Sequence, residues 1–139
     1  MLALTISDVR GFMVKLLKDE VFDDFQLRNA VINTFARFEI YGGKDDGYVS
    51  WSLVRPYVFG LVKGELKPKN IKVILGKDKD GADNPLSLFV NIYFEDDKVN
   101  LTTGISKKGF SLDRSDDENW DMQVLKFLDD NEITYKNEI

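Results

Sequence analysis

Lysine side chains concentrate in the middle of a chain whose net charge is −5. Because Lys and Arg side chains bind phosphate groups, this segment predicts a site for a nucleic acid or another phosphate-bearing ligand. Trp51 and Tyr57 lie just before it and offer rings on which unpaired bases can stack. The residues of this candidate site are Arg55, Lys63, Lys67, Lys69 and Lys72, joined by Lys107 and Lys108 if the sheet brings those turns together.

The same residues also have a purely structural interpretation, which we favour. Lysine is common on edge strands, where it discourages aggregation, and Pro68 indicates an exposed connector. The aromatic residues Trp51, Tyr57 and Trp120 are typical of a core or its margin. The acidic average also argues against a dedicated nucleic-acid binder, because phosphate binding favours a basic face.

Histidine and cysteine are absent from all 139 residues. Their absence excludes Ser-His-Asp and Cys-His catalysis, disulfide bonds and ordinary zinc sites. The chemistry that remains rests on carboxylates, Lys, Tyr, hydroxyl groups and backbone dipoles, as in Mg²⁺-dependent enzymes. We predict no cofactor, and we assign no residue as catalytic or as a metal ligand.

Acidic residues recur in short runs, which raises the alternative of a magnesium site. Adjacent residues on a strand point to opposite faces, so one doublet alone makes a poor catalytic pair. Two runs from distant segments would have to converge in space before they could hold Mg²⁺. The runs are Asp23-Asp24, Asp45-Asp46, Glu95-Asp96-Asp97 and Asp129-Asp130.

Two segments resemble ligand-binding loops but lack essential residues. Residues 104–111 approach the P-loop pattern, yet Phe110 stands where a Lys must reach the phosphates. Residues 78–84 approach a calcium loop, yet Ala82 occupies the fifth position, where an oxygen ligand is needed. We interpret the first segment as a hairpin turn and the second as a solvated turn.

Apolar residues at helical spacing predict three helices that would position these side chains. The first covers residues 6–19 and has a T-x-x-D capping pattern at Thr5. The second covers 52–63, with Ser50 or Ser52 as its N-cap. The third follows the S-x-x-E capping box that begins at Ser115.

Alternating apolar residues predict the strands between those helices. Two strands lie within 22–41, and a short one covers 71–75. The clearest strand, 86–95, turns at Asp96-Asp97 and returns over 99–105. A last short strand near Phe110 and one before Thr5 are compatible with the sequence. The fold class is therefore α+β, an antiparallel sheet of about five strands with three helices in the order α-ββ-α-βββ(β)-α.

Length and composition predict one globular domain over residues 1–139. The hydrophobic and charged fractions, 43% and 31%, are those of a chain that buries a core. No apolar run approaches the roughly 20 residues that a membrane span requires. The N-terminus lacks the basic and apolar regions of a secretory signal. We therefore expect a cytoplasmic protein that is not associated with a membrane.

Several strings of the sequence are distinctive, namely residues 1–9, 35–42 (FARFEIYG), 51–64 (WSLVRPYVFGLVKG), 101–104 and 120–121. In these strings the chain resembles an uncharacterised bacterial family of short single-domain proteins, known only as a domain of unknown function. The resemblance covers nearly the whole chain and implies a single domain. It carries no activity, ligand or catalytic residue.

Three functional hypotheses follow from these observations. The first, which we favour, is a small intracellular, non-catalytic binding or interaction domain whose partner is another protein or a second copy of itself. The alternative is nucleic-acid or phosphate-ligand binding through the Lys63–Lys72 segment. The third is a Mg²⁺-dependent carboxylate enzyme, which requires acidic residues from separate segments to meet in one pocket.

Overall fold

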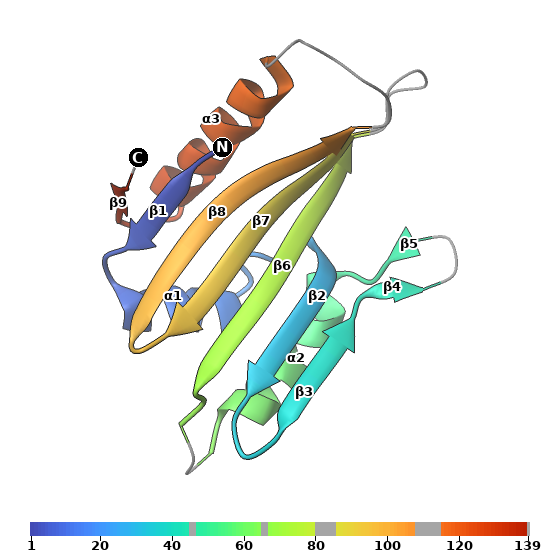
Figure 1. Ribbon diagram of the computed structural model, residues 1–139, viewed down its shortest axis with the longest axis vertical. Helices are drawn as coiled ribbons and strands as arrows, with labels where there is room; N and C mark the ends of the chain where they lie inside the picture. The colour runs from blue at the N-terminus through green and yellow to red at the C-terminus, as the bar shows by residue number, and fades with distance from the viewer. Residues whose placement is uncertain (45–46, 65–66, 80–85, 108–114, 139) are drawn as a thin grey trace.

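The computed structural model describes residues 1–44, 47–64, 67–79, 86–107 and 115–138 (Figure 1). Within these ranges, single helices separate runs of strands. In chain order the elements are β1 (Ala3–Ile6), α1 (Val9–Leu17), β2 (Gln26–Asn33), β3 (Arg37–Tyr41), β4 (Gly43–Lys44), β5 (Gly47–Tyr48), α2 (Trp51–Val62), β6 (Asn70–Lys79), β7 (Leu86–Glu95), β8 (Lys98–Lys107), α3 (Ser115–Asp130) and β9 (Tyr135–Asn137).

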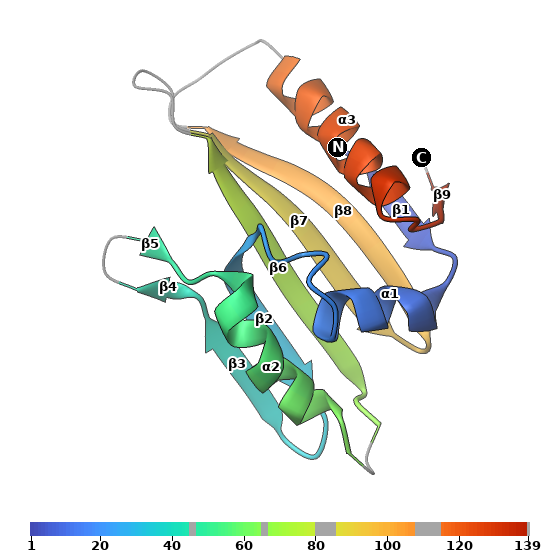
Figure 2. The same ribbon diagram turned by 180° about the vertical axis from the view of Figure 1, so that it is seen from behind.

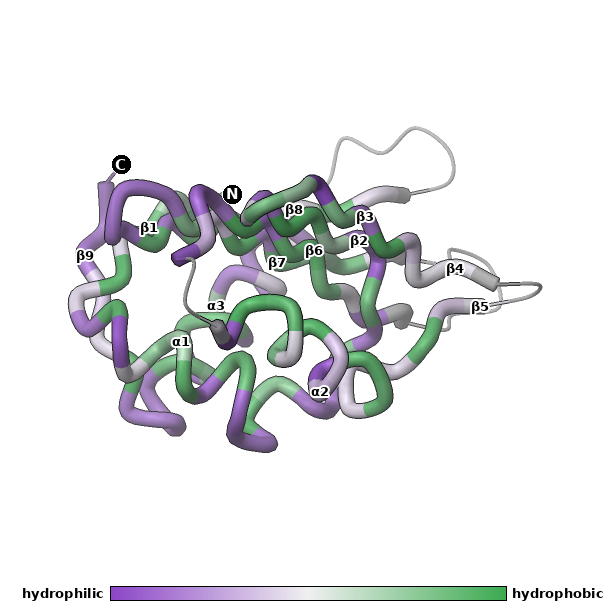
Figure 3. The backbone as a smooth tube through the Cα atoms, turned by 90° about the horizontal axis from the view of Figure 1, so that it is seen from below, coloured by the Kyte–Doolittle hydropathy of each residue, from purple (hydrophilic) through white to green (hydrophobic). Residues whose placement is uncertain are grey.

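Seven of the described strands form one sheet in the order β3-β2-β6-β7-β8-β1-β9, and every neighbouring pair is antiparallel. β4 and β5 form a separate small hairpin. The helices α1, α2 and α3 all lie on one side of the sheet (Figures 1 and 2). Seen edge-on, the molecule therefore consists of a sheet layer and a helix layer (Figure 3).

Two buried tryptophans each form a hydrogen bond that joins a helix to a neighbouring element. The indole N–H of Trp51, at the start of α2, donates to the carbonyl oxygen of Leu16 in α1 at 3.1 Å. The indole N–H of Trp120, in α3, donates to the carbonyl oxygen of Phe89 in β7 at 2.9 Å. Because a buried indole N–H needs a partner, each bond fixes the position of its helix as well as satisfying the donor.

The side of the sheet that carries no helix, which we call the open face, is defined by strand alternation. Along β7, Val90 and Ile92 are buried against the helix layer. The residues that alternate with them, Phe89, Asn91 and Tyr93, therefore point to the other side, because successive strand residues face opposite ways. The same alternation holds in β6 and β8, which flank β7.

The α+β class with an antiparallel sheet and three helices is confirmed, but the predicted strand number and element order are wrong. The sheet has seven described strands instead of about five. β1, with four residues, and β9, with three, are not among those five strands. Strands this short contain too few alternations to be recognised, and they form because β1 pairs with both β8 and β9.

The first helix begins later than the predicted residue 6. Ile6 belongs to β1, where it is buried and pairs with Tyr135. The N-cap is Asp8, whose carboxylate accepts a hydrogen bond from the Gly11 backbone N–H at 3.0 Å. The sequence pattern predicted Thr5 as the N-cap, with Asp8 three residues into the helix. Asp8 is therefore a capping residue as predicted, but it occupies the N-cap position itself.

The hairpin of β7 and β8 is confirmed, with its turn at Asp96-Asp97. Both turn residues have positive φ, 54° and 61°, as a two-residue hairpin turn of the primed type requires. β6 extends to Lys79, beyond the predicted 71–75. The predicted strand near Phe110 lies outside the described residues, as do residues 80–84 of the first loop-like segment and 108–111 of the second.

No helix within the described ranges is long and apolar enough to cross a membrane.

Candidate functional site

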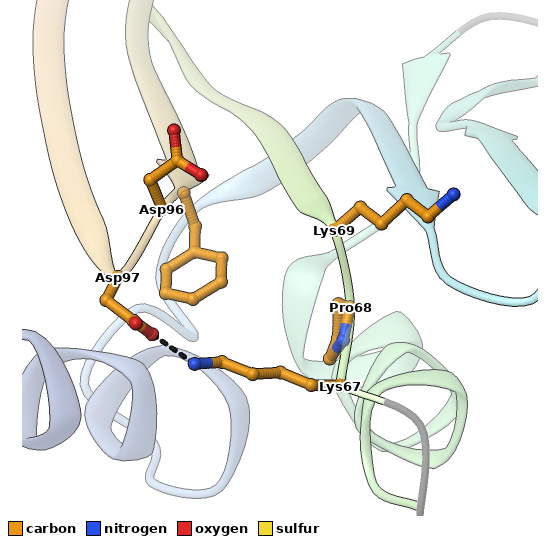
Figure 4. A pocket seen from close by; sticks show the side chains of 6 residues that line it. Lys67, Pro68, Lys69, Asp96 and Asp97 are labelled. Atoms are coloured by element: carbon orange, nitrogen blue, oxygen red, sulfur yellow. Dashed lines mark hydrogen bonds and ion pairs between the residues drawn. The ribbon is translucent and has the colours of Figure 1, made fainter.

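The predicted lysine segment contributes two residues to a small pocket at the end of the sheet (Figure 4). The pocket has a volume of about 290 Å³ and lies where the start of β6 meets the turn between β7 and β8. Lys67 reaches across it and forms an ion pair with Asp97. Asp96 stands beside this pair, so carboxylates oppose the lysines within the pocket. Its lining residues are Lys67, Pro68, Lys69, Phe94, Asp96 and Asp97.

This arrangement is unfavourable for a phosphate. Lys67 already has a carboxylate partner, and any anion entering the pocket would also meet Asp96. The lysine side chains do not converge either, because Lys69 points away from Lys67 toward β2 and β3 (Figure 4). The pocket therefore contains a solvated ion pair, which contributes little to stability when both partners are this exposed.

Arg55 has a structural partner in the helix layer. Its guanidinium makes two hydrogen bonds to the Asp23 carboxylate, at 2.9 and 3.0 Å, and a third to the carbonyl oxygen of Lys18 at 2.9 Å. The hydrogen bond with Asp23 raises the pKa of Arg55 above its usual value. Arg55 thus connects α2 to the segment that follows α1, and it is not directed toward Lys67 and Lys69.

The remaining predicted cations are separated by the fold. Lys63 ends α2, and its ammonium lies 5.7 Å from the centre of the Phe59 ring. Lys72 lies on β6 opposite Tyr93, whereas Lys107 lies on β8 opposite Leu86. Seven residues of β7 separate those two positions, which is about 23 Å along the strand. Lys107 therefore does not join the lysine segment, and Lys108 lies outside the described residues.

The two predicted stacking residues differ completely in exposure. Trp51 is 0% exposed and belongs to the core, so it offers no surface to a ligand. Tyr57, on the outer side of α2, is 76% exposed, and Leu53 of the same helix is 66% exposed. Tyr57 nevertheless belongs to α2, which lies on the helix side of the sheet (Figure 2), whereas Lys72 pairs with Tyr93 on the open face.

The open face brings together side chains that are far apart in the sequence. Tyr93 stands at its centre, paired with Lys72 on one side and Asn100 on the other. Because directly paired residues of a sheet share a face, the register defines a continuous row across it. From one edge to the other this row is Glu39, Val31, Lys72, Tyr93, Asn100, Thr5 and Lys136.

Polar side chains on the open face are held by hydrogen bonds to their neighbours. Asn91 donates to the Thr102 hydroxyl at 3.2 Å, and the Thr5 hydroxyl donates to Asn100 at 3.2 Å. Tyr93 donates its hydroxyl to Glu95, and this bond raises the pKa of Tyr93 above its usual value near 10. The bond directs the Tyr93 hydroxyl toward Glu95, and 39% of the residue is exposed.

Phe89 occupies a second aromatic position on β7, with glycine on both neighbouring strands. Its register partners are Gly76 in β6 and Gly104 in β8. A Cβ atom added at Gly104 would lie 3.9 Å from the Phe89 ring, so the ring extends toward that glycine. On the other side, a Cβ at Gly76 would lie 2.3 Å from Nε of Arg28, whose side chain crosses over Gly76.

Arg28 was not recognised in the sequence, although it is the one buried charged residue in the described part of the chain. It occupies the bulge in β2 between Leu27 and Asn29. Its guanidinium stacks on the Tyr48 ring, 3.8 Å from the ring centre, and donates to the Ser87 hydroxyl at 3.1 Å. A charge held this way rigidifies one end of the open face.

The open face is basic although the chain as a whole is acidic. Apart from the buried Arg28, the described side chains of its strands include four cations and two carboxylates, whereas α3 alone carries six acidic residues and one lysine. The sequence conceals this separation, because it depends on strand alternation across five strands. The cations are Arg37, Lys72, Lys98 and Lys136, and the carboxylates are Glu39 and Glu95.

The acidic runs do not assemble a metal centre in the described residues. No group of three or more carboxylates is placed there to hold an ion. Three of the runs contribute ion pairs instead, through Asp23 with Arg55, Asp97 with Lys67, and Asp130 with Lys126. The fourth run, Asp45-Asp46, lies outside the described residues.

Fold and surface together define a two-layer α+β protein with a bare, basic sheet face. Comparison with protein families places the chain more specifically. Residues 15–87 and 76–136 match a family of unknown function, DUF5721, and the chain belongs to this family. This confirms the resemblance to a domain of unknown function. Neither the curated proteins nor the solved structures gave a match.

Proposed function

We propose that this protein is a small, non-catalytic binding domain and that the open face is its binding surface. The observation that carries the proposal is that the three described helices lie on one side of the sheet and leave the other side uncovered (Figures 1 and 2). Sheets that are merely solvated on one face commonly expose simple polar residues there. This face also presents aromatic rings, amide groups and an excess of cations.

The side chains of the open face suit recognition because they are already ordered. Asn91, Thr102, Asn100 and Tyr93 have their orientations set by hydrogen bonds with neighbours. A surface that is ordered before binding loses less conformational entropy when a ligand arrives. Ten-residue strands provide a rigid support, which favours precise placement of binding groups over placement on loops.

A protein partner or self-association also stays a proposal, with the exposed Leu53 and Tyr57 of α2 as the residues that would serve it. A cytoplasmic location likewise stays a proposal, supported by the absence of cysteine. A partner bound at α2 is compatible with a ligand at the open face, because α2 lies on the other side of the sheet.

Side-chain amide signals in NMR spectra test the proposal directly. Asn91 and Asn100 carry NH₂ groups on the open face, and Asn131, which donates to the carbonyl oxygen of Phe127, reports from the helix layer. The probes are oligothymidylate, a heparin oligosaccharide, a neutral oligosaccharide and an unstructured peptide, each titrated separately. We expect at least one probe to shift the signals of Asn91 and Asn100 and leave that of Asn131 in place.

The proposal fails if every probe leaves the two open-face signals unmoved. It also fails if a bound probe shifts only residues of α2 or of the pocket between Lys67 and Asp97. The thermal stability of the protein with each probe provides a control, because a ligand that binds only the folded state must raise the unfolding temperature.

A further inference from the structure

We infer that the ligand of the open face is single-stranded nucleic acid, an inference that rests on the proposed function and names its ligand class. Three properties of the face support this class over others: its charge, the spacing of its aromatic rings, and the polar groups between those rings. The predicted Lys63–Lys72 segment contributes only Lys72 to this surface.

The charge of the open face is complementary to a polyanion. Lys72 lies in the middle of the sheet, and Lys98, Arg37 and Lys136 lie around it on β8, β3 and β9. All four are exposed. Six acidic residues lie on α3, in the helix layer on the other side of the sheet. A phosphate backbone is therefore attracted to one side of the molecule and repelled from the other, which also orients the approach.

The aromatic rings on β7 favour bases over a uniform anionic polymer. Phe89 and Tyr93 lie four residues apart on the same side of one strand, a separation of about 13 Å. Tyr93 is directly opposite Lys72, so a base stacked on this ring has a cation next to its phosphate. Rings on the central strands of an open sheet are a recurrent way to stack unpaired bases, which a duplex cannot offer because its bases are stacked inside.

Amide and hydroxyl groups fill the space between the two rings. Asn91 lies between Phe89 and Tyr93 on β7, and its register partner is Thr102 on β8. Such groups donate and accept hydrogen bonds and can contact the edges of bases as well as sugar hydroxyls. Every second residue of this part of β7 therefore contributes to the face, as an aromatic ring, an amide group and a second aromatic ring.

Fluorescence anisotropy with a labelled oligothymidylate tests the inference. We expect Tyr93→Ala to lower the affinity at least about fivefold, because stacking on one ring is usually worth that much. The matched control is Tyr57→Ala, which removes a more exposed tyrosine from α2 and should leave the affinity unchanged. A duplex of the same length should bind more weakly than the single strand.

Salt dependence tests the contribution of Lys72 separately. We expect Lys72→Gln to make the plot of log affinity against log salt shallower by about 0.7, the contribution of one phosphate contact in a single strand. The control Lys126→Gln removes a lysine of α3, which pairs with Asp130 in the helix layer, and should not change the slope. Circular dichroism of each variant verifies that it remains folded.

Several results would overturn the inference. It fails if oligothymidylate does not bind at low salt, or if Tyr93→Ala binds as tightly as the unchanged protein. It also fails if heparin binds equally well and its affinity depends on Lys72 alone, because the face would then recognise charge and not bases. If another probe shifts the signals of Asn91 and Asn100 and oligothymidylate does not bind at all, the open face is supported as the binding surface. Single-stranded nucleic acid is then excluded as its ligand.

Discussion

Thr103 is a buried polar residue on the covered face of the sheet, and its hydroxyl connects three segments. It accepts a hydrogen bond from the Leu2 backbone N–H at 2.8 Å and donates one to the Asp121 carboxylate at 2.5 Å. Asp121 in turn forms an ion pair with the amino group of Met1 at 3.0 Å. The N-terminal segment, β8 and α3 are therefore held together by one polar network.

We predict that Thr103→Val lowers the free energy of unfolding by about 1–3 kcal/mol, because it leaves the Leu2 N–H without its partner and removes one of the two partners described for the Asp121 carboxylate. Urea denaturation measures the loss. Thr102→Val is the matched control, since the Thr102 hydroxyl lies on the open face and accepts only from Asn91 among the described residues. Equal losses in the two variants would contradict the role given to the network.

At the residue scale, the sequence shows which side chains are charged or aromatic, but not which residues those side chains contact. Lys72 was predicted as a site residue, and it does lie on the proposed surface. Arg55 was predicted with it, but Asp23, 32 residues earlier, engages its guanidinium. A long-range ion pair of this kind leaves no local pattern in the sequence, so no spacing rule could have removed Arg55 from the site.

Glycine positions show how individual elements tolerate change. Gly42 lies between β3 and β4, and its N–H donates to the carbonyl oxygen of Arg28 at 3.1 Å. A Cβ atom at Gly42 would lie only 1.9 Å from the carbonyl oxygen of Leu27. Gly60, in contrast, lies inside α2, and a Cβ there would meet nothing within 4 Å.

We predict opposite effects for alanine at these two glycines. Gly42→Ala should destabilise the protein by about 1–3 kcal/mol, because backbone atoms must move to admit the methyl group. Gly60→Ala should stabilise it by about 0.5–1 kcal/mol, because alanine loses less backbone freedom than glycine in a helix. Thermal unfolding measures both. A lower unfolding temperature for Gly60→Ala would show that this part of α2 needs glycine for another reason.

At the element scale, long periodic segments are predictable and short ones depend on their neighbours. The strand 86–95 and its turn were predicted with their observed bounds, because apolar and polar residues that alternate over ten positions fit a strand and not a helix. Ile6 was assigned to a helix because its spacing to Val9 and Met13 fits a helical stripe. Pairing of β1 with β8 and β9 overrides that local pattern.

At the scale of the whole molecule, function depends on the order of strands in the sheet. β1 lies between β8 and β9, and β2 lies next to β6, so the open face is assembled from both ends of the chain. The hydrophobic pattern predicts which residues of each strand face the core. It does not predict which strands are neighbours, and so the row from Glu39 to Lys136 could not be found before the fold was known.

Charge separation is the second property that only the whole molecule reveals. A net charge of −5 suggested that nucleic acid is disfavoured as a partner. The fold places six acidic residues on α3 in the helix layer, and it leaves the described side chains of the open face with more cations than carboxylates. An average over the chain therefore says little about the surface that a ligand meets.

A bulky label placed on one face at a time tests the open face as the binding surface most directly. Because the chain has no cysteine, Asn100→Cys and Met122→Cys each create a single site for a large maleimide. Asn100 lies on the open face beside Tyr93, and Met122 is 68% exposed on α3. We predict that the label at position 100 abolishes oligothymidylate binding and that the label at position 122 leaves it intact. Binding that survives the first label, or is lost only with the second, would contradict the account.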